Sequence, residues 1–230
     1  MEIIGGVNMT LQELLDQCKG GIGMTERNVP KVMDGSKTQT RRTVRFCKLS
    51  DDHGRPIADE CFVDPSYQKP DFGNVPCLKV PFDGGLAGRT IHRHFPSYQV
   101  GDRLYVKEAL KKAECPPDYP FARYKSDSMP VQPRGIARPW KRDDGTPWKQ
   151  NVIPARYMPK SAARTVIEIT DVKCERIQDI SVEDVKAEGC RPLRDHVAHF
   201  QELWNDTNGN DAWERNDWTF AYTFKILEPS

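Results

Sequence analysis

The side chains best suited to chemistry lie in segment 37–45, Lys-Thr-Gln-Thr-Arg-Arg-Thr-Val-Arg. Its β-branched residues favour an extended strand. Side chains alternate along a strand, which gives one face with Lys37, Gln39 and Arg41 and another with Thr38, Thr40 and Arg42. Lys37, Arg41, Arg42 and Arg45 could form a solvated strand or one that faces phosphates, and the carboxylate of Glu188 would then pair with one of them.

A second basic region mixes cations with aromatic rings. It contains Arg134, Arg138, Lys141, Arg142, Lys149, Arg156, Lys160 and Arg164, interleaved with Trp140, Trp148 and Tyr157. Cations attract a phosphate backbone, and rings such as Tyr105, Trp140 or Trp148 could stack on an exposed base. This composition predicts a nucleic-acid surface, and a solvated loop is the competing interpretation.

Cysteines and histidines also gather in the sequence. Those in or beside the irregular regions are Cys47, Cys61, Cys77, His92, His94 and Cys115. There is no Cys-x-x-Cys pair, so unpaired thiols are a simpler interpretation than a zinc site, and we expect no metal and no cofactor.

The elements that must position these residues are short helices and strands. Helices are expected over 10–18, capped by Thr10 with Glu13 three residues later and ended by Gly20-Gly21, and over 25–34, ended by Gly35. Further helices are expected after the Ser181 cap, up to Gly189, and over 193–204. Strands are expected over 103–107, 163–175 and 218–227. The pattern predicts the α+β class.

Two long Pro- and Gly-rich stretches, about 47–98 and 111–151, interrupt this pattern. They are too long for ordinary loops and predict insertions with short pieces of structure. We therefore expect a helical extension over 1–21 and one domain over 22–230.

Four segments together resemble the ASCH domain. They are Gly35–Arg42 (Gly-Ser-Lys-Thr-Gln-Thr-Arg-Arg), Val100–Glu108, Tyr157–Arg164 and Asp179–Gly189, and they occur in the family's order. The closing Phe200–Trp204 and Trp213–Trp218 resemble the version common in tailed-phage genomes. The resemblance implies a PUA-like fold, a mixed β-barrel with flanking helices, whose cavity binds RNA or a modified base.

The resemblance also implies a chemistry. A bacterial branch of the family hydrolyses N4-acetylcytidine with a lysine, a threonine and a glutamate that match Lys37, Thr40 and Glu188 here. The threonine hydroxyl needs a base, which a desolvated lysine can supply, and the glutamate relays a proton to the leaving amine. Lys37 and Thr40 point to opposite faces of an ideal strand, so the site requires a bend or a bulge.

This chain departs from that branch. It has Ser36 where arginine is usual, Arg41 where an aliphatic residue is found, and the two insertions. Binding without catalysis is the leading interpretation. The residues predicted to bind a nucleic acid or base are Thr38, Arg41, Arg42, Arg45, Tyr105, Lys107, Glu108, Trp148, Lys160 and Arg164.

Composition and charge predict the cellular location and the partners of the protein. The seven scattered cysteines, with no leader and no apolar span, predict a soluble cytoplasmic protein, in the host if the gene is of phage origin. The first 170 residues carry a net charge of about +7 and the rest about −6, which favours a basic face for phosphates. The expected partner is RNA, DNA or a modified nucleoside, without a membrane. An accessory protein that binds a protein partner is the third class.

Overall fold

The computed structural model describes residues 9–44, 55–56, 62–64, 68–69, 73–74, 76–83, 89–112, 122–131, 151–190 and 195–228. The chain divides into two compact units. Unit 1 comprises Met1–Lys37, Gly101–Glu168 and Phe224–Ser230, and unit 2 comprises Thr38–Val100 and Ile169–Thr223. The expected extension over 1–21 and single domain over 22–230 remain a prediction.

Unit 1 is built on a parallel strand pair. Strand β1 (Gly20–Gly23) pairs with β9 (Arg103–Lys107), and β9 pairs antiparallel with the start of β13 (Val166–Arg176). The register places Gly20 beside Leu104 and Tyr105 beside Val166. Ile22, Leu104, Val106 and Ile167 are buried on one face, because apolar residues alternate along these strands.

Helix α1 (Leu11–Asp16) packs on the opposite face of these strands, which carries Tyr105 and Val166. Thr10 and Glu13 form the predicted capping box, and the buried Leu14 and Leu15 join a cluster with Leu110, Met158 and Val166. The cluster includes the small sheet of β10 (Leu110–Lys112), β11 (Ala122–Tyr124) and β12 (Val152–Ile153). Helix α2 (Val29–Met33) ends before Gly35. The backbone at this position has a φ of 74°, a left-handed conformation that favours glycine. The 3-10 helices η4 (Ala155–Tyr157) and η5 (Lys160–Ala162) complete unit 1.

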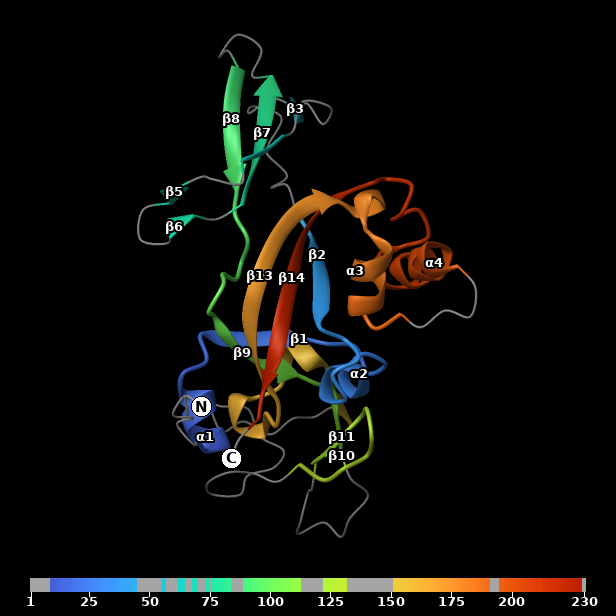
Figure 1. Cartoon of the computed structure of the whole chain (residues 1–230). Coiled ribbons are helices and arrows are strands. Elements are labelled where there is room, and N and C mark those ends of the chain that lie inside the picture. Colours follow the sequence, from blue (N-terminus) through green and yellow to red (C-terminus); the bar gives the residue numbers. More distant parts are fainter. Residues whose placement is uncertain are drawn as a thin grey trace, which may run out of the picture. The chain divides into compact units, whose positions relative to one another are not determined.

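Unit 2 contains the strand that the sequence singled out. Strand β2 (Gln39–Thr43) pairs antiparallel with residues 219–223 of β14 (Trp218–Leu227) in an unbroken register. After β13 come η6 (Ile177–Asp179), α3 (Val182–Ala187) and α4 (His196–Asn208). Figure 1 shows α3 and α4 beside each other, and they enclose a core that contains Ile177, Val185, Phe200 and Trp204.

The first irregular stretch was expected to hold only short pieces of structure, but it contains an antiparallel hairpin of two longer strands. Strands β7 (Cys77–Asp83) and β8 (Arg89–His94) pair antiparallel (Figure 1). Short strands β3 (Arg55–Pro56) and β4 (Phe62–Asp64) pair with β7, and β5 (Gln68–Lys69) pairs with β6 (Gly73–Asn74). Much of the second stretch, 113–121 and 132–150, lies outside the described residues.

The fold is of the mixed α+β class, as predicted, with mainly sheet and few helices. Hydrogen bonding in the main sheet follows the order β1-β9-β13-β14-β2, and this path is open within the described residues. The expected β-barrel is therefore not closed there. Two details differ from expectation: Gly20 and Gly21 belong to a strand instead of ending a helix, and α4 begins at His196 after an Asp195 cap.

Candidate functional site

The buried guanidinium of Arg41 is the centre of a polar cluster in unit 2. In β2, Gln39 and Arg41 are two residues apart and therefore point to the same face. Their register partners on β14 are Thr223 and Ala221. Gln39 donates a hydrogen bond of 3.2 Å to the Thr223 hydroxyl, and Arg41 Nη1 donates one of 2.5 Å to Gln39 Oε1. The predicted alternation of the strand is thus confirmed over these residues.

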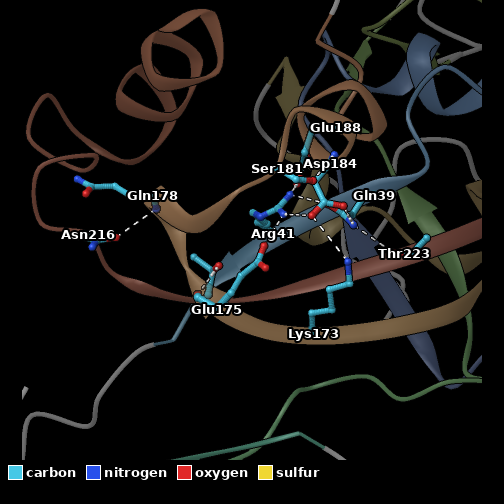
Figure 2. Close-up of polar contacts among 11 residues, drawn as sticks. Gln39, Arg41, Lys173, Glu175, Gln178, Ser181, Asp184, Glu188, Asn216 and Thr223 are labelled. Atoms are coloured by element: carbon cyan, nitrogen blue, oxygen red, sulfur yellow. Dashed lines mark hydrogen bonds and ion pairs between the residues drawn. The ribbon is translucent and has the colours of Figure 1, made fainter. Parts of the chain in front are cut away.

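Three carboxylates surround Arg41 (Figure 2). Its Nη2 lies 2.6 Å from a Glu175 oxygen and 3.2 Å from an Asp184 oxygen, and its Nη1 lies 3.2 Å from a Glu188 oxygen. Asp184 and Glu188 are one helical turn apart on α3 and its C-cap, so both face β2, and Glu175 comes from β13. The side chain of Arg41 is 0 % exposed. The cluster joins three distant segments of unit 2.

The carboxylates of this cluster share the Arg41 guanidinium. A second cation, Lys173, lies 3.8 Å from Asp184. Burial alone would raise the pKa of Asp184, but the Gln39 hydrogen bond, the charges of Arg41 and Lys173 and the Ser181 hydrogen bond lower it below its ordinary value. Arg41 Nε is buried and lacks a hydrogen-bond partner within the described structure.

The other residues predicted on or near this strand lie in different environments. Thr40 is buried and pairs in register with Tyr222, on the face opposite Arg41. Thr38 is exposed, and its N–H donates to the Ala187 carbonyl at 2.8 Å. Arg42 is exposed, Lys37 in unit 1 is 2 % exposed, and Arg45 lies outside the described residues.

Gln39, Glu175 and Asp184 were missed as site residues. Asp184 could have been found, because it lies four residues before Glu188 on a predicted helix and would share its face. Glu175 is separated from Arg41 by 134 residues, and only the sheet pairing brings them together.

A second cluster lies in unit 1 around predicted residues Glu108 and Arg164. Arg164 Nε and Nη2 donate to the two Glu108 oxygens at 2.9 and 2.7 Å, and Nη1 donates to Asp127 at 2.7 Å. Ser126 donates to Glu108 at 3.0 Å, and the guanidinium lies 3.7 Å from the Tyr124 ring centroid. The Glu108 hydrogen bond and the two carboxylate charges raise the pKa of Arg164 although burial opposes this. These contacts join the residue after β9, the turn after β11 and the segment between η5 and β13, which is a structural role.

Aromatic and basic side chains meet at a third place, which we call the Tyr157 surface: Tyr105, Lys107, Arg156 and Tyr157 of unit 1. Lys107 Nζ lies 5.6 Å from the Tyr105 ring centroid and donates to the Arg156 carbonyl at 3.3 Å. The Arg156 guanidinium lies 4.8 Å from the Tyr157 ring centroid, and Tyr157 is 52 % exposed. Neither Lys107 nor Arg156 forms an ion pair with a described carboxylate.

Gly21 of β1 makes room for this surface. A Cβ atom there would lie 2.5 Å from Lys107 Cε and 2.6 Å from the Tyr105 ring. The absence of a side chain lets both residues lie against β1.

Several predictions fall outside the described residues. These include Trp148 and Trp140, the basic residues between Arg134 and Lys149, and the cysteines Cys47, Cys61 and Cys115. Lys160 is half-buried. Within the described part of the chain, no group of three metal-ligating side chains occurs, and Cys77 is a buried cysteine outside any disulfide. The described helices include none with the length and apolar character needed to cross a membrane.

Comparison of the chain with known proteins assigns no function to these clusters. No family model matches the chain, and neither the curated proteins nor the solved structures contain a match. The function is therefore inferred from the geometry of the described residues and from the sequence motifs.

Proposed function

We propose that this protein binds a nucleic acid or a modified nucleobase, as a PUA-like domain of the ASCH kind. The support from sequence is the order of the four motif segments. Among the described residues these segments provide β2, β9, the η4–η5 region and α3. Every motif thus contributes to one of the three polar groups described above.

The observation that carries the proposal is the pair of cations on the Tyr157 surface. Lys107 and Arg156 lie next to each other and have no carboxylate partner in the described structure. Cations that are not neutralised within the protein are available for phosphates, and binding then releases counterions from the nucleic acid.

The charge of unit 1 supports the same function. By sequence it contains 19 basic and 14 acidic residues, whereas unit 2 contains 15 basic and 19 acidic residues. An excess of basic residues raises the local concentration of polyanions and speeds association. We therefore assign the phosphate contacts to unit 1.

Binding isotherms at several salt concentrations test the proposal. Fluorescence anisotropy with labelled RNA and DNA should show affinity that falls as salt rises, and Lys107→Gln and Arg156→Gln should each lower the slope of log K against log salt by about one. Arg215→Gln in unit 2 is the matched control, since it removes one exposed cation elsewhere. Salt-independent or absent binding of the wild-type protein to every oligonucleotide contradicts the proposal.

Hydrolysis of an N4-acylated cytidine is the second candidate. The observation in its favour is that Lys37, Thr40 and Glu188 are 2, 4 and 8 % exposed, since polar side chains are seldom buried without a role or a partner. Two features of unit 2 count against it. The Glu188 carboxylate is paired with Arg41, and Thr40 points to the face of β2 opposite Arg41.

A product assay tests this second candidate. Purified protein is incubated with N4-acetylcytidine and N4-acetyldeoxycytidine, and release of cytidine or deoxycytidine with acetate is followed by chromatography. Turnover that is lost in Lys37→Ala, Thr40→Ala and Glu188→Gln, with folding intact, establishes hydrolysis. No turnover in the wild-type protein leaves the binding function.

A further inference from the structure

We infer that Tyr157 is a stacking platform for an unpaired base, so that the protein prefers single-stranded to double-stranded nucleic acid. The inference deepens the proposed function and depends on it. Its starting point is an aromatic ring that stays 52 % exposed while other large aromatic residues of the described chain, such as Tyr124 and Tyr222, are buried.

The backbone around the ring is well held. The Tyr157 N–H donates to the Pro154 carbonyl at 2.9 Å, and the next residue, Met158, is 3 % exposed within the core of unit 1. Met158 also accepts a hydrogen bond at its sulfur from the Glu108 N–H, at 3.1 Å. Because Tyr157 lies between a proline turn and a buried side chain, little backbone entropy would be lost when a base stacks on it.

The cations beside the ring select the ligand class. The Arg156 guanidinium lies over the Tyr157 ring at 4.8 Å, and Lys107 donates a hydrogen bond to the Arg156 carbonyl. A base in a single strand offers an open π-face with a phosphate within one nucleotide, which matches a ring flanked by cations. In a duplex each base is already stacked on both faces, and only its phosphates remain for Lys107 and Arg156.

The test compares one sequence of about 12 nucleotides as a single strand and as a duplex, with the full chain and matched variants. Tyr157→Ala should weaken single-strand binding about 5- to 100-fold, Tyr157→Phe should retain it, and duplex binding should change less than about twofold. Met129→Ala is the control, because it removes another exposed side chain, 56 % exposed, from unit 1.

A spectroscopic readout separates stacking from a general loss of affinity. A single strand that carries 2-aminopurine should lose fluorescence on binding to wild-type protein and to Tyr157→Phe, and keep it with Tyr157→Ala at saturating concentration. Wild-type protein that binds both forms equally, or Tyr157→Ala that binds the single strand normally, overturns the inference and leaves the proposed function intact. Absence of any salt-dependent binding overturns both.

Discussion

Arg164 holds the carboxylate of Glu108 with two parallel hydrogen bonds, one to each oxygen, at 2.9 and 2.7 Å. The Glu108 side chain is 1 % exposed, whereas that of Arg164 is 17 % exposed. Removing the two partners should therefore have unequal effects, since only one of them is fully deprived of water.

Arg164→Met leaves a buried, uncompensated carboxylate and should lower the free energy of unfolding by about 3 to 5 kcal/mol. Glu108→Gln keeps one acceptor for Arg164 and should cost less, about 1 to 3 kcal/mol. Urea unfolding followed by circular dichroism measures both. Lys125→Met, in the exposed pair with Glu26, is the control and should cost no more than about 1 kcal/mol. If Lys125→Met and Arg164→Met lowered the free energy of unfolding equally, the buried Arg164–Glu108 pair would have no special structural role.

Gly21→Ala should be destabilising although it is a small change. Its Cβ would lie within 3 Å of both Lys107 and the ring of Tyr105, which packs against the core of unit 1. Moving a ring of that kind costs about 1 to 3 kcal/mol. Gly23→Ala, in the same strand with nothing within 4 Å, should be neutral or stabilise by about 0.4 to 1 kcal/mol. Comparable unfolding midpoints for the two variants would refute the close packing at Gly21.

Arg41→Met should destabilise the protein by about 3 to 5 kcal/mol, because three carboxylates then face one another without their common cation. Arg41→Lys keeps the charge but loses the planar fork, and its loss should be smaller. Lowering the pH toward the range where carboxylates protonate should recover stability in Arg41→Met, which thermal unfolding at a series of pH values can measure. A variant as stable as wild type at neutral pH would show that the cluster contributes nothing.

The wild-type protein should lose stability in acid. The pKa of Asp184 lies below its ordinary 3.8, and the hydrogen bond from Lys225 is the first cause that lowers the pKa of Glu168 below its ordinary 4.5. A carboxyl whose pKa is lower in the folded state contributes stability above its unfolded pKa, and this is lost as the pH falls through the folded value.

The free energy of unfolding should therefore be constant near neutrality and decrease from about pH 4.5 downward. Asp184→Asn should reduce that slope, because it removes a carboxyl whose pKa is lowered in the folded state. Urea titrations at half-unit pH steps give the slopes. An Asp184→Asn profile parallel to that of the wild type would exclude the carboxylate as a source of the acid sensitivity.

Elements with local signals could be predicted from the sequence. The Thr10 and Glu13 capping box depends on residues three apart, and β9 and β14 have the bounds that their alternating apolar residues indicated. Strand β1 could not be predicted, because three of its four residues are glycines and its existence depends on parallel pairing with residues more than 80 positions later.

The candidate site was predictable only in part, for the same reason. The strand alternation placed Gln39 and Arg41 on one face, but no local feature indicated that Arg41 would be fully buried. Arginine is rarely buried without partners, and the carboxylate partners of Arg41 come from segments 134 to 147 residues away. Tyr157 was noted among the basic residues, but no local pattern indicated that it would be exposed while the next residue, Met158, is buried.

Unit 1 is assembled from three separate stretches of chain, and the last of them starts at Phe224. Lys225 binds Glu168 at 2.7 Å, and Leu227 packs against the unit's core. During translation, this unit therefore lacks part of its core and an ion pair until the residues after 224 have left the ribosome exit tunnel. Ribosome-bound chains arrested before that point should be sensitive to proteases throughout unit 1, and a contiguous excised fragment cannot reproduce the unit.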